Sequence, residues 1–502
     1  MSDFEGVSPD QSRRLEGLGV ELNALNTIAE EERTQKPSSL FWPWFGANVS
    51  VLGLSYGSYL LAFGLSLWQA TIVGLVGIVF SFLLCGLVSI AGKRGSAPTM
   101  VTSRAAFGVH GNRAPSVLSW LLAVGWETVL TSLAVLTTAT VFVQLGWDGG
   151  LGTKIAALAV VVVLVLAGGI AGFNVIMKMH KWITIVTGVL TVVYIALVAN
   201  RIDFGVVADL PAGSPQALMG GCVFIMTGFG LGWVISAADF SRYLPRSTPY
   251  SRVVGWTTIG GALAPAILLV FGILLAGSSP ELNKAIGIDP VGALATLLPT
   301  WFLIPFAVVA VLGLVGGAVL GIYSSGLALL SAGIPIPRYA AAGLDGIIMT
   351  LGAIYVAFFS TDFIGPFQGF LITLGVPVAA WCGIFLADLS LRRSDYAERD
   401  LYDPRGRYGA TPIAPLLILA GSTVAGWGLV TNTSAGWLDW QGFLLEPFGL
   451  GGREGAWAYA NLGVLVAMII GFVATLLLSR GAVRAQETAS AEPIAKNASP
   501  VK

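Results

Sequence analysis

Long apolar runs separated by short polar segments follow one another along most of this chain. A helix needs roughly 20 predominantly apolar residues to cross about 30 Å of hydrocarbon at about 1.5 Å per residue. Windows of that size predict twelve membrane-spanning helices, near residues 41–66, 68–91, 115–145, 153–172, 175–199, 216–238, 251–276, 302–333, 338–359, 363–388, 412–431 and 456–479. The runs are continuous rather than alternating, which argues against a β-barrel. We therefore expect an all-α polytopic membrane protein.

Polar segments flank the apolar region at both ends. Residues 1–40 carry charged positions such as Glu30 and Arg33, and residues 480–502 are rich in small and polar residues. Such compositions cannot bury enough apolar surface to fold alone. We expect flexible cytoplasmic tails at 1–40 and 480–502, with the membrane domain between them at 41–479.

Composition supports the membrane assignment. Of the 502 residues 55% are hydrophobic and only 11% are charged, whereas soluble domains carry about 25% charged residues. The 27 basic and 27 acidic residues cancel, so no basic field favours nucleic acid as a partner. The three cysteines, Cys85, Cys222 and Cys382, lie inside apolar runs, which argues against a disulfide framework or a metal site.

The positions of Lys and Arg predict the orientation. With a cytoplasmic N-terminus and twelve spans, 23 of these residues fall on the cytoplasmic side and four on the other. Cytoplasmic loops are enriched in Lys and Arg, so the asymmetry supports an even number of spans and two cytoplasmic termini. The chain is expected to be a multi-pass protein of the cell membrane.

Two spans contain polar and glycine residues at bilayer depth. Span 1 has Asn48, Ser50 and Gly53 within its apolar run, and span 6 reads Thr227-Gly-Phe-Gly-Leu-Gly-Trp233. Each interior glycine weakens a helix by about 1 kcal/mol relative to alanine, and irregular backbone is tolerated where it lines a cavity. Packing notches are the alternative explanation for either span alone.

The two breaks lie five spans apart. This spacing predicts two inverted repeats of five helices, at about 41–200 and 216–388, with two extra helices in 412–479. Secondary transporters bind substrate at such breaks. A primary ATP-driven pump is disfavoured because no Gly-x4-Gly-Lys-[Ser/Thr] motif is present: Gly92-Lys93 is followed by Arg94.

Glu127 is the one acid or base that the sequence places near the centre of a span. A charged side chain there costs roughly 3 kcal/mol. Glu127 should therefore face the bundle interior and either hold a proton or find a partner, which suits proton-coupled transport. The alternative is a protonated carboxyl bonded to a backbone carbonyl.

Other polar residues receive structural assignments. Asp239, Asp345, Asp362 and Asp388 fall at helix ends, where surface or capping roles are expected. His110 and His180 have no metal-ligand neighbours in the sequence and are expected to be structural.

Most tryptophans, Trp44 among them, are expected at membrane interfaces. Trp126 and Trp233 lie deep, beside Glu127 and the span-6 break, which favours stacking on a flat ring over core packing alone. Such stacking contributes about 1–3 kcal/mol.

Several stretches resemble the nucleobase–cation symporter family, which includes the purine–cytosine permeases. The entry to span 1, Phe41-Trp-Pro-Trp-Phe-Gly-Ala-Asn48, is similar to that family's opening. The loop after span 2, Pro98-x4-Ser103-Arg104-x2-Phe107-Gly108-Val109, is similar to a more specific signature. Span 6 ends in a third similar stretch, Ala237-Ala-Asp-Phe-Ser-Arg-Tyr-Leu-Pro245. The resemblance covers roughly residues 20–480.

The resemblance implies a LeuT-like fold, with substrate held among spans 1, 3, 6 and 8. Two amides that the family often carries are replaced here, by Leu130 in span 3 and Gly321 in span 8. Other groups, Glu127 first, must then bond the ligand. The candidate substrate-binding residues are Asn48, Ser50, Gly53, Trp126, Glu127, Gly228, Phe229, Gly232, Trp233, Ser324, Ser325 and Gln368.

The predicted function is import of a purine, pyrimidine or related planar heterocycle by alternating access. The sodium-coupled members use hydroxyls in span 8, and residues 306–321 contain none, so a proton is the expected coupling ion, carried by Glu127. A hydantoin, allantoin, vitamin-like pyridine or nucleoside stays open as substrate, and so does the oligomeric state. A sensor or channel is the alternative class. An enzyme is disfavoured because no nucleophile–base pair stands out.

Overall fold

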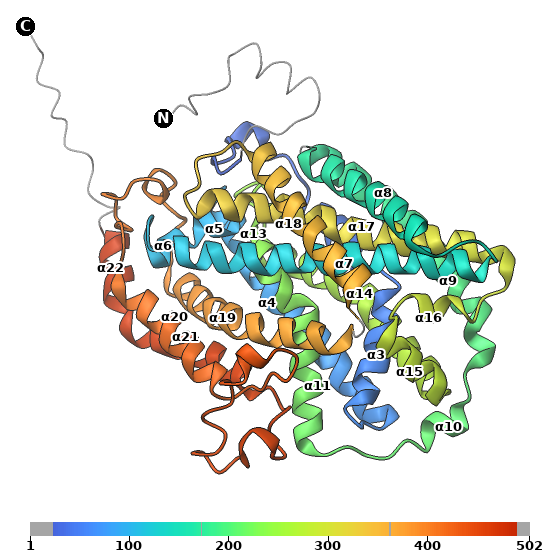
Figure 1. The fold of residues 1–502 in the computed structure, drawn as a ribbon. Coiled ribbons are helices and arrows are strands. Elements are labelled where there is room, and N and C mark those ends of the chain that lie inside the picture. The colour runs from blue at the N-terminus through green and yellow to red at the C-terminus, as the bar shows by residue number, and fades with distance from the viewer. Residues whose placement is uncertain (1–23, 172, 361–362, 489–502) are drawn as a thin grey trace, which may run out of the picture.

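The computed structural model describes residues 24–171, 173–360 and 363–488, and in these ranges all regular secondary structure is helical (Figure 1). The helices are α2 (Phe41–Asn48), α3 (Leu52–Ala62), α4 (Leu67–Gly95), α5 (Thr99–Thr102), α6 (Arg104–Phe107), α7 (Arg113–Gln144), α8 (Leu151–Ile170), α9 (Phe173–Val198), α10 (Phe204–Ala208), α11 (Pro215–Gly228), α12 (Gly230–Trp233), α13 (Ala237–Ser241), α14 (Tyr250–Gly277), α15 (Pro280–Ile288), α16 (Gly292–Ala295), α17 (Thr300–Ser331), α18 (Arg338–Phe359), α19 (Ile364–Leu391), α20 (Ile413–Trp427), α21 (Leu462–Leu478) and α22 (Arg480–Thr488).

Nine helical segments of the described chain are long and apolar enough to cross a membrane. They are α4, α7, α8, α9, the segment Pro215–Ser241, α14, α17, α18 and α19. The broken pair α2–α3, the shorter α20, and α21 with the bent α22 account for the other predicted spans. The protein is thus an all-helical membrane protein with about nine to twelve spans.

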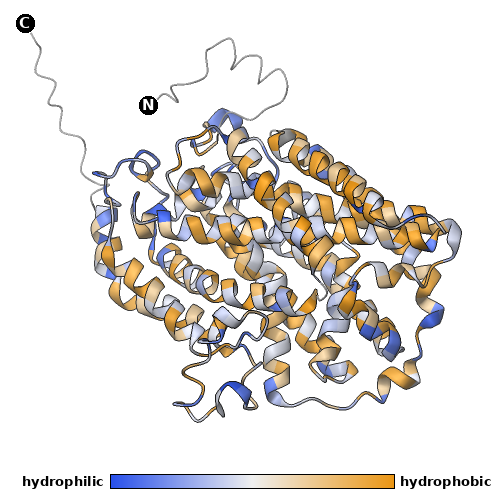
Figure 2. Ribbon diagram, in the orientation of Figure 1, coloured by the Kyte–Doolittle hydropathy of each residue, from blue (hydrophilic) through white to orange (hydrophobic). Residues whose placement is uncertain are grey.

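The outer helices expose apolar side chains along their length. Only a third of the most apolar window is buried in α8, α9 and α18, and Val163, Val192 and Tyr355 are each more than 60% exposed. Figure 2 shows hydrophobic residues along the long helices and hydrophilic ones concentrated in connecting segments. A continuous apolar surface of this kind suits lipid rather than water.

Helices that are far apart in the sequence pack against each other, α4 on α14 and α7 on α17. Glycines allow the backbones of α3 and α14 to come into direct contact. A β-carbon on Gly57 would lie 2.3 Å from the backbone nitrogen of Ile273, and one on Gly272 would lie 2.0 Å from the carbonyl oxygen of Leu54. Small residues let membrane helices approach this closely.

Parts of both predicted tails are ordered, contrary to the expectation of flexible segments. Residues 30–32 and 37–40 form 3-10 turns, and Arg33 between them is buried. At the other end, α22 brings Gln486 within 2.8 Å of Arg392. Buried guanidinium groups need several acceptors, and folding the tail segments onto the helix ends supplies them. Residues 1–23 and 489–502 lie outside the described ranges.

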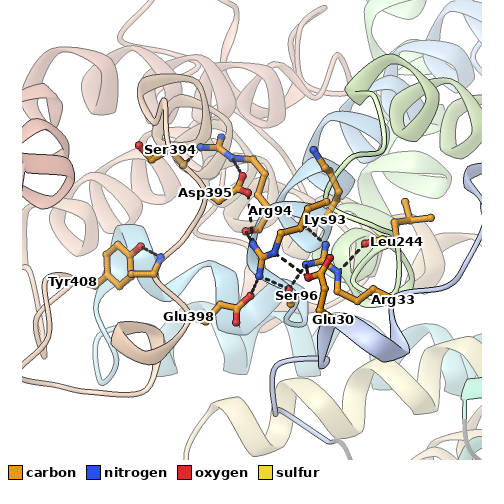
Figure 3. Close-up of polar contacts among 12 residues, drawn as sticks. Glu30, Arg33, Lys93, Arg94, Ser96, Leu244, Ser394, Asp395, Glu398 and Tyr408 are labelled. Carbon is orange, nitrogen blue, oxygen red and sulfur yellow. Dashed lines mark hydrogen bonds and ion pairs between the residues drawn. The ribbon is translucent and has the colours of Figure 1, made fainter. Parts of the chain in front are cut away.

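Arginines join four segments at one end of the bundle (Figure 3). We call Arg33, Arg94 and Arg246 with Glu30, Asp395 and Glu398 the arginine cluster. Arg33 donates to Lys93 O (2.6 Å), Ser96 Oγ (2.7 Å) and Leu244 O (2.9 Å). The cluster ties the N-terminal segment to the end of α4, the segment after α13 and the loop after α19.

Candidate functional site

A cavity of about 60 Å³ lies where the broken spans meet α7 and α17. It is lined by Ala47, Asn48, Ser50, Leu52, Gly53 and Tyr56 from span 1, Ala123, Trp126, Glu127 and Leu130 from α7, Gly228, Phe229, Gly232, Trp233, Ile235 and Ser236 from span 6, and Gly317 and Gly321 from α17. Nine of the twelve predicted binding residues are among them. The space is well below the roughly 300–1,000 Å³ of typical ligand pockets, so a ring-sized ligand requires these helices to move apart.

Span 1 breaks at residues 49–51, within the predicted polar stretch. Asn48 ends α2, and its side-chain amide donates to Trp44 O at 2.8 Å. Ser50 Oγ accepts from the backbone N–H of Leu52 at 3.3 Å, at the start of α3. Polar side chains thus satisfy backbone groups that the break frees, as irregular backbone inside a membrane requires.

Span 6 breaks at Phe229, whose backbone angles (φ −121°, ψ −114°) are non-helical. The N–H of Gly230 donates to Ser81 Oγ of α4 at 3.1 Å. A β-carbon on Gly230 would lie 2.2 Å from the backbone carbon of Ser81, so the glycine allows the break to press against α4. The glycine-rich stretch is therefore a break in the span, as predicted.

Glu127 is fully buried and lines the cavity from α7. Among the described residues neither of its carboxylate oxygens meets a hydrogen-bond partner. Ser325 lies close to Glu127. Its hydroxyl, however, donates its hydrogen to Asp345 Oδ2 at 2.8 Å rather than to Glu127. A buried polar group without partners carries a large desolvation penalty, so this carboxyl can be satisfied by a proton together with a ligand.

Trp126 and Trp233 reach the cavity from different spans, as predicted. A β-carbon on Gly232 would lie 3.1 Å from Trp126 Nε1, so the indole of Trp126 lies against the span-6 break. Trp233 packs edge-on against Trp44 at a ring-centroid distance of 5.7 Å. Trp44 is completely buried, so its expected place at the membrane interface is wrong. Its ring supports Trp233 instead.

Three predicted binding residues lie outside this cavity. Ser324 and Ser325 are buried in α17 near Asp239 and Asp345 respectively. Gln368 lines a second cavity, of about 490 Å³, with residues from the ends of α3 and α11 and from the segment 431–461. Ser324 and Ser325 follow Gly317 and Gly321 on the same face of α17, about one turn beyond the part of that face that lines the cavity.

Sequence reasoning missed Tyr56 in the cavity wall. Its side chain is 1% exposed, and its hydroxyl donates to Gly228 O at 3.3 Å, across the two breaks. Tyr56 follows the polar stretch of span 1 in the sequence, and this position could have indicated that it lines the cavity. The ring also contacts Phe229 at 4.4 Å between centroids.

Surface or capping roles were expected for the acids at helix ends; the structure buries three of them, so a surface position is wrong for these three, while Asp239 does take a capping role. Asp239 accepts from the N–H and hydroxyl of Thr99, both at 2.8 Å, and caps α5 from a buried position. Asp345 accepts from Trp120 Nε1 at 2.6 Å, and Asp388 pairs with Arg392 at 2.7 Å. All three carboxylates are buried, and each has a hydrogen-bond or ion-pair partner, because burying an unpaired charge is energetically costly. Asp362 lies outside the described residues.

Aromatic rings separate the two cavities. Tyr56 lines the smaller cavity and Phe224 lines the larger, and their ring centroids lie 5.7 Å apart. Phe367 contacts Trp126 at 5.6 Å and Phe224 at 6.4 Å. The large cavity is lined from the end of α3 and from α11, near the start of α4, whereas Arg94 of the arginine cluster lies at the end of α4. Figure 1 shows these two ends of α4 at opposite ends of the bundle.

Residues 27–438 match the family model described as a permease for cytosine/purines, uracil, thiamine and allantoin. The chain belongs to this family. Its members are membrane transporters and not enzymes, which agrees with the broken spans around a buried cavity.

Individual relatives agree with this family. A putative purine–cytosine permease of Bacillus subtilis, YxlA, is 26% identical over 406 residues, covering 78% of this chain and 84% of that protein. The purine–cytosine permease FCY21 of Saccharomyces cerevisiae is 29% identical over 280 residues, about half of each chain.

Solved structures establish the fold. Mhp1, a nucleobase–cation symport family transporter in a closed conformation with bromovinylhydantoin bound, superimposes with a TM-score of 0.66 at 18% identity, covering 94% of this chain and 96% of that one. A Na⁺-coupled sialic acid symporter in an outward-open state gives 0.54 at 14% identity, covering 92% and 93%. The predicted LeuT-like architecture is confirmed.

Proposed function

We propose that this permease imports a purine, pyrimidine or related planar heterocycle across the cell membrane together with a proton. One observation carries the proposal: Glu127 is buried without a hydrogen-bond partner among the described residues, in a cavity between two broken spans. Glu127 receives the proton and bonds the ligand's polar edge. A protonated carboxyl can donate one hydrogen bond and accept others, which matches the mixed donors and acceptors of a nucleobase.

Trp126 and Trp233 provide aromatic surface for the ring. Both are half-buried at the cavity, so part of each indole is available to a ligand. Backbone groups at the breaks, near Gly228 and Ser50, supply further hydrogen bonds, as in transporters with unwound helices. The family description includes bases and allantoin, and Mhp1 holds a hydantoin, so hydantoin or allantoin is the second candidate substrate.

Access alternates between the two ends of the bundle. The 490 Å³ cavity beside Gln368 forms the outer vestibule, and the rings of Tyr56, Phe224 and Phe367 close it from the binding cavity. The arginine cluster closes the cytoplasmic end. Opening either end requires one of these barriers to part while the other stays shut.

The side chains of α17 that face span 1 favour a proton over sodium as the coupling ion. Residues 306–321 of α17 carry no hydroxyl, and Gly313, Gly316 and Gly317 face the broken span 1 there. Hard cations prefer several oxygen ligands, which this helix face does not supply from side chains. A proton needs only one basic atom.

Uptake by purified protein in proteoliposomes tests the proposal. A thermal-shift screen first selects a ligand among cytosine, uracil, hypoxanthine, hydantoin and allantoin, because ligand binding raises apparent stability. An imposed pH gradient, acidic outside, should then drive accumulation, and a sodium gradient should not. Glu127→Gln should abolish the pH-gradient dependence, while Glu454→Gln at an exposed position should behave like the wild type. Non-saturable flux would favour a channel, and unchanged proton dependence in Glu127→Gln would exclude Glu127 from coupling.

A further inference from the structure

His180 is a buried imidazole in α9 whose two ring nitrogens both face carbonyl oxygens. The side chain is 0% exposed. Nδ1 lies 3.0 Å from the oxygen of Ile176, one turn earlier in α9, and Nε2 lies 3.0 Å from the oxygen of Gly316 in α17. The ring therefore bridges two membrane-spanning helices.

The two contacts have consequences for the protonation of the ring. A carbonyl oxygen can only accept a hydrogen bond, whereas a neutral imidazole has one donor nitrogen and one acceptor nitrogen. The neutral ring can satisfy one of the two contacts and leaves lone pairs facing each other at the second. Only the doubly protonated ring donates to both Ile176 and Gly316. The geometry is that of a site for one added proton.

The ring also lies beside the broken span 1. A β-carbon on Gly46 would lie 3.1 Å from His180 Cδ2 and 2.8 Å from Thr184 Oγ1. Gly46 belongs to the last turn of α2, which packs against both α9 and α17. Thr184 Oγ1 is a second buried polar atom there without a hydrogen-bond partner among the described residues. Movement of α2 thus changes the surroundings of His180 directly.

Within the described part of the chain, the helices that pack most extensively against α9 carry no acid that could compensate a charge on this ring. The helices α2, α8 and α17 pack around α9, and α2 carries no titratable side chain. The titratable groups of the other helices and of α9 itself are Lys154, Lys178, Lys181, Tyr194 and Tyr323. Lys178 and Lys181 are exposed, Lys154 donates to Ala357 O, and the hydroxyls of Tyr194 and Tyr323 contact Leu294 O and Arg242. The carbonyl oxygens are therefore the groups that stabilise the protonated ring.

We propose that His180 is a second proton-binding site, which couples proton binding to the position of the broken span 1. Protonation fixes α9 to α17 through Gly316, and loss of the proton from one ring nitrogen releases that contact beside Gly46. Gly316 and Gly321 lie on the same helix, and Gly321 faces Glu127, so α17 connects the two sites. This inference rests on the proposed proton coupling and replaces the structural role that the sequence suggested for His180.

Nitrogen-15 NMR of histidine in the intact protein tests the proton site without any substrate. The chain has two histidines, and His110 is exposed, so the variant His110→Gln leaves His180 as the single signal. Titration between pH 5 and 8, the range in which histidine usually changes charge, should move the ring from one protonated nitrogen to two. A ring with the same protonation throughout this range would overturn the proposal.

Transport assays test the coupling. His180→Gln is neutral at every pH and should lose pH-gradient-driven accumulation of the ligand found in the screen while keeping substrate counterflow, which needs no net proton movement. His110→Gln is the control and should keep both. Gradient-driven accumulation by His180→Gln would contradict the coupling role. If the wild type shows no pH-gradient-driven uptake, the proposed function fails, and the NMR titration still decides whether His180 binds a proton.

Discussion

Glu127 occupies the space beside Gly321, where a β-carbon would lie 2.9 Å from Glu127 Cγ. The family resemblance implies amide side chains at positions 130 and 321, where this chain has Leu130 and Gly321. The carboxyl of α7 therefore fills the volume that a side chain on α17 would take. Glu127 thus supplies a hydrogen-bonding side chain to the cavity wall, where Leu130 and Gly321 supply none.

Gly321→Ala should displace the Glu127 carboxyl and weaken ligand binding by roughly tenfold, about 1.4 kcal/mol. Overpacking in a tight interior typically costs about 1–3 kcal/mol, partly offset by alanine's better helix propensity. Isothermal titration with the selected ligand measures the effect. Gly326→Ala on the same helix is the control, because its nearest contact is 3.8 Å away. Equal affinities in the two variants would contradict the role of Gly321.

Trp126→Ala and Trp233→Ala should each raise the Kd for a ring ligand by about 5- to 150-fold. The reason is the loss of ring stacking, which contributes about 1–3 kcal/mol. Trp→Phe at either position should retain part of the affinity because an aromatic face remains. Trp182→Ala, at a position 67% exposed on the outer face of α9, should bind like the wild type. An unchanged Kd in both cavity variants would show that the indoles only pack the core.

Arg33→Ala should destabilise the protein by about 3 kcal/mol or more. The Arg33 side chain is completely buried and donates to three acceptors, and each hydrogen bond from a charged donor contributes about 1.5–3 kcal/mol. Arg246→Ala is the comparison, since its side chain is 36% exposed and its ion pairs are screened by water and salt. Thermal unfolding should therefore show a large loss for Arg33 and a small, salt-dependent one for Arg246. Equal losses would contradict this account of the cluster.

Asp388→Asn should cost about 3–5 kcal/mol because it leaves the buried guanidinium of Arg392 without its counter-charge. Both side chains are 3% exposed, and two contacts of 2.7 Å join them. Asp400→Asn, in the more exposed pair with Arg407, should cost about 1 kcal/mol or less. The double variant Asp388→Asn with Arg392→Gln should recover part of the stability, and failure to recover any would mean that the two residues act independently.

Gln368→Cys should react with a membrane-impermeant thiol reagent added outside intact cells. Gln368 lines the large cavity at the end opposite the arginine cluster, and the distribution of Lys and Arg predicts that end to be external. Replacing Cys222 by Ser first removes the one native thiol that is not buried. Arg399→Cys, exposed beside the cluster, should react only after permeabilisation. Labelling of Arg399→Cys from outside intact cells, with Gln368→Cys labelled only after permeabilisation, would show that the orientation in the membrane is the reverse of the predicted one.

Much of the cavity lining could be predicted from the sequence, because the residues that mark it stand out from their immediate neighbours in the chain. Glu127 is recognisable as a carboxyl in an apolar run, and the breaks at 49–51 and at Phe229 follow from polar and glycine residues that weaken a helix. Ser324, Ser325 and Gln368 lie outside the cavity, because how far a cavity extends along a helix depends on the side chains that neighbouring helices pack against it. Tyr56 was missed for the same reason.

The sequence by itself determined the membrane environment, the all-helical architecture and the two broken spans, because each follows from hydropathy and helix propensity over a few consecutive residues. Only the tertiary structure decided which polar groups are partnered. Asp239, Asp345 and Asp388 gain donors from distant helices, whereas Glu127 is left without one among the described residues, and His180 meets a carbonyl 136 positions away in Gly316. The cost of burying a polar group depends on what packs against it, and packing joins residues that the chain separates.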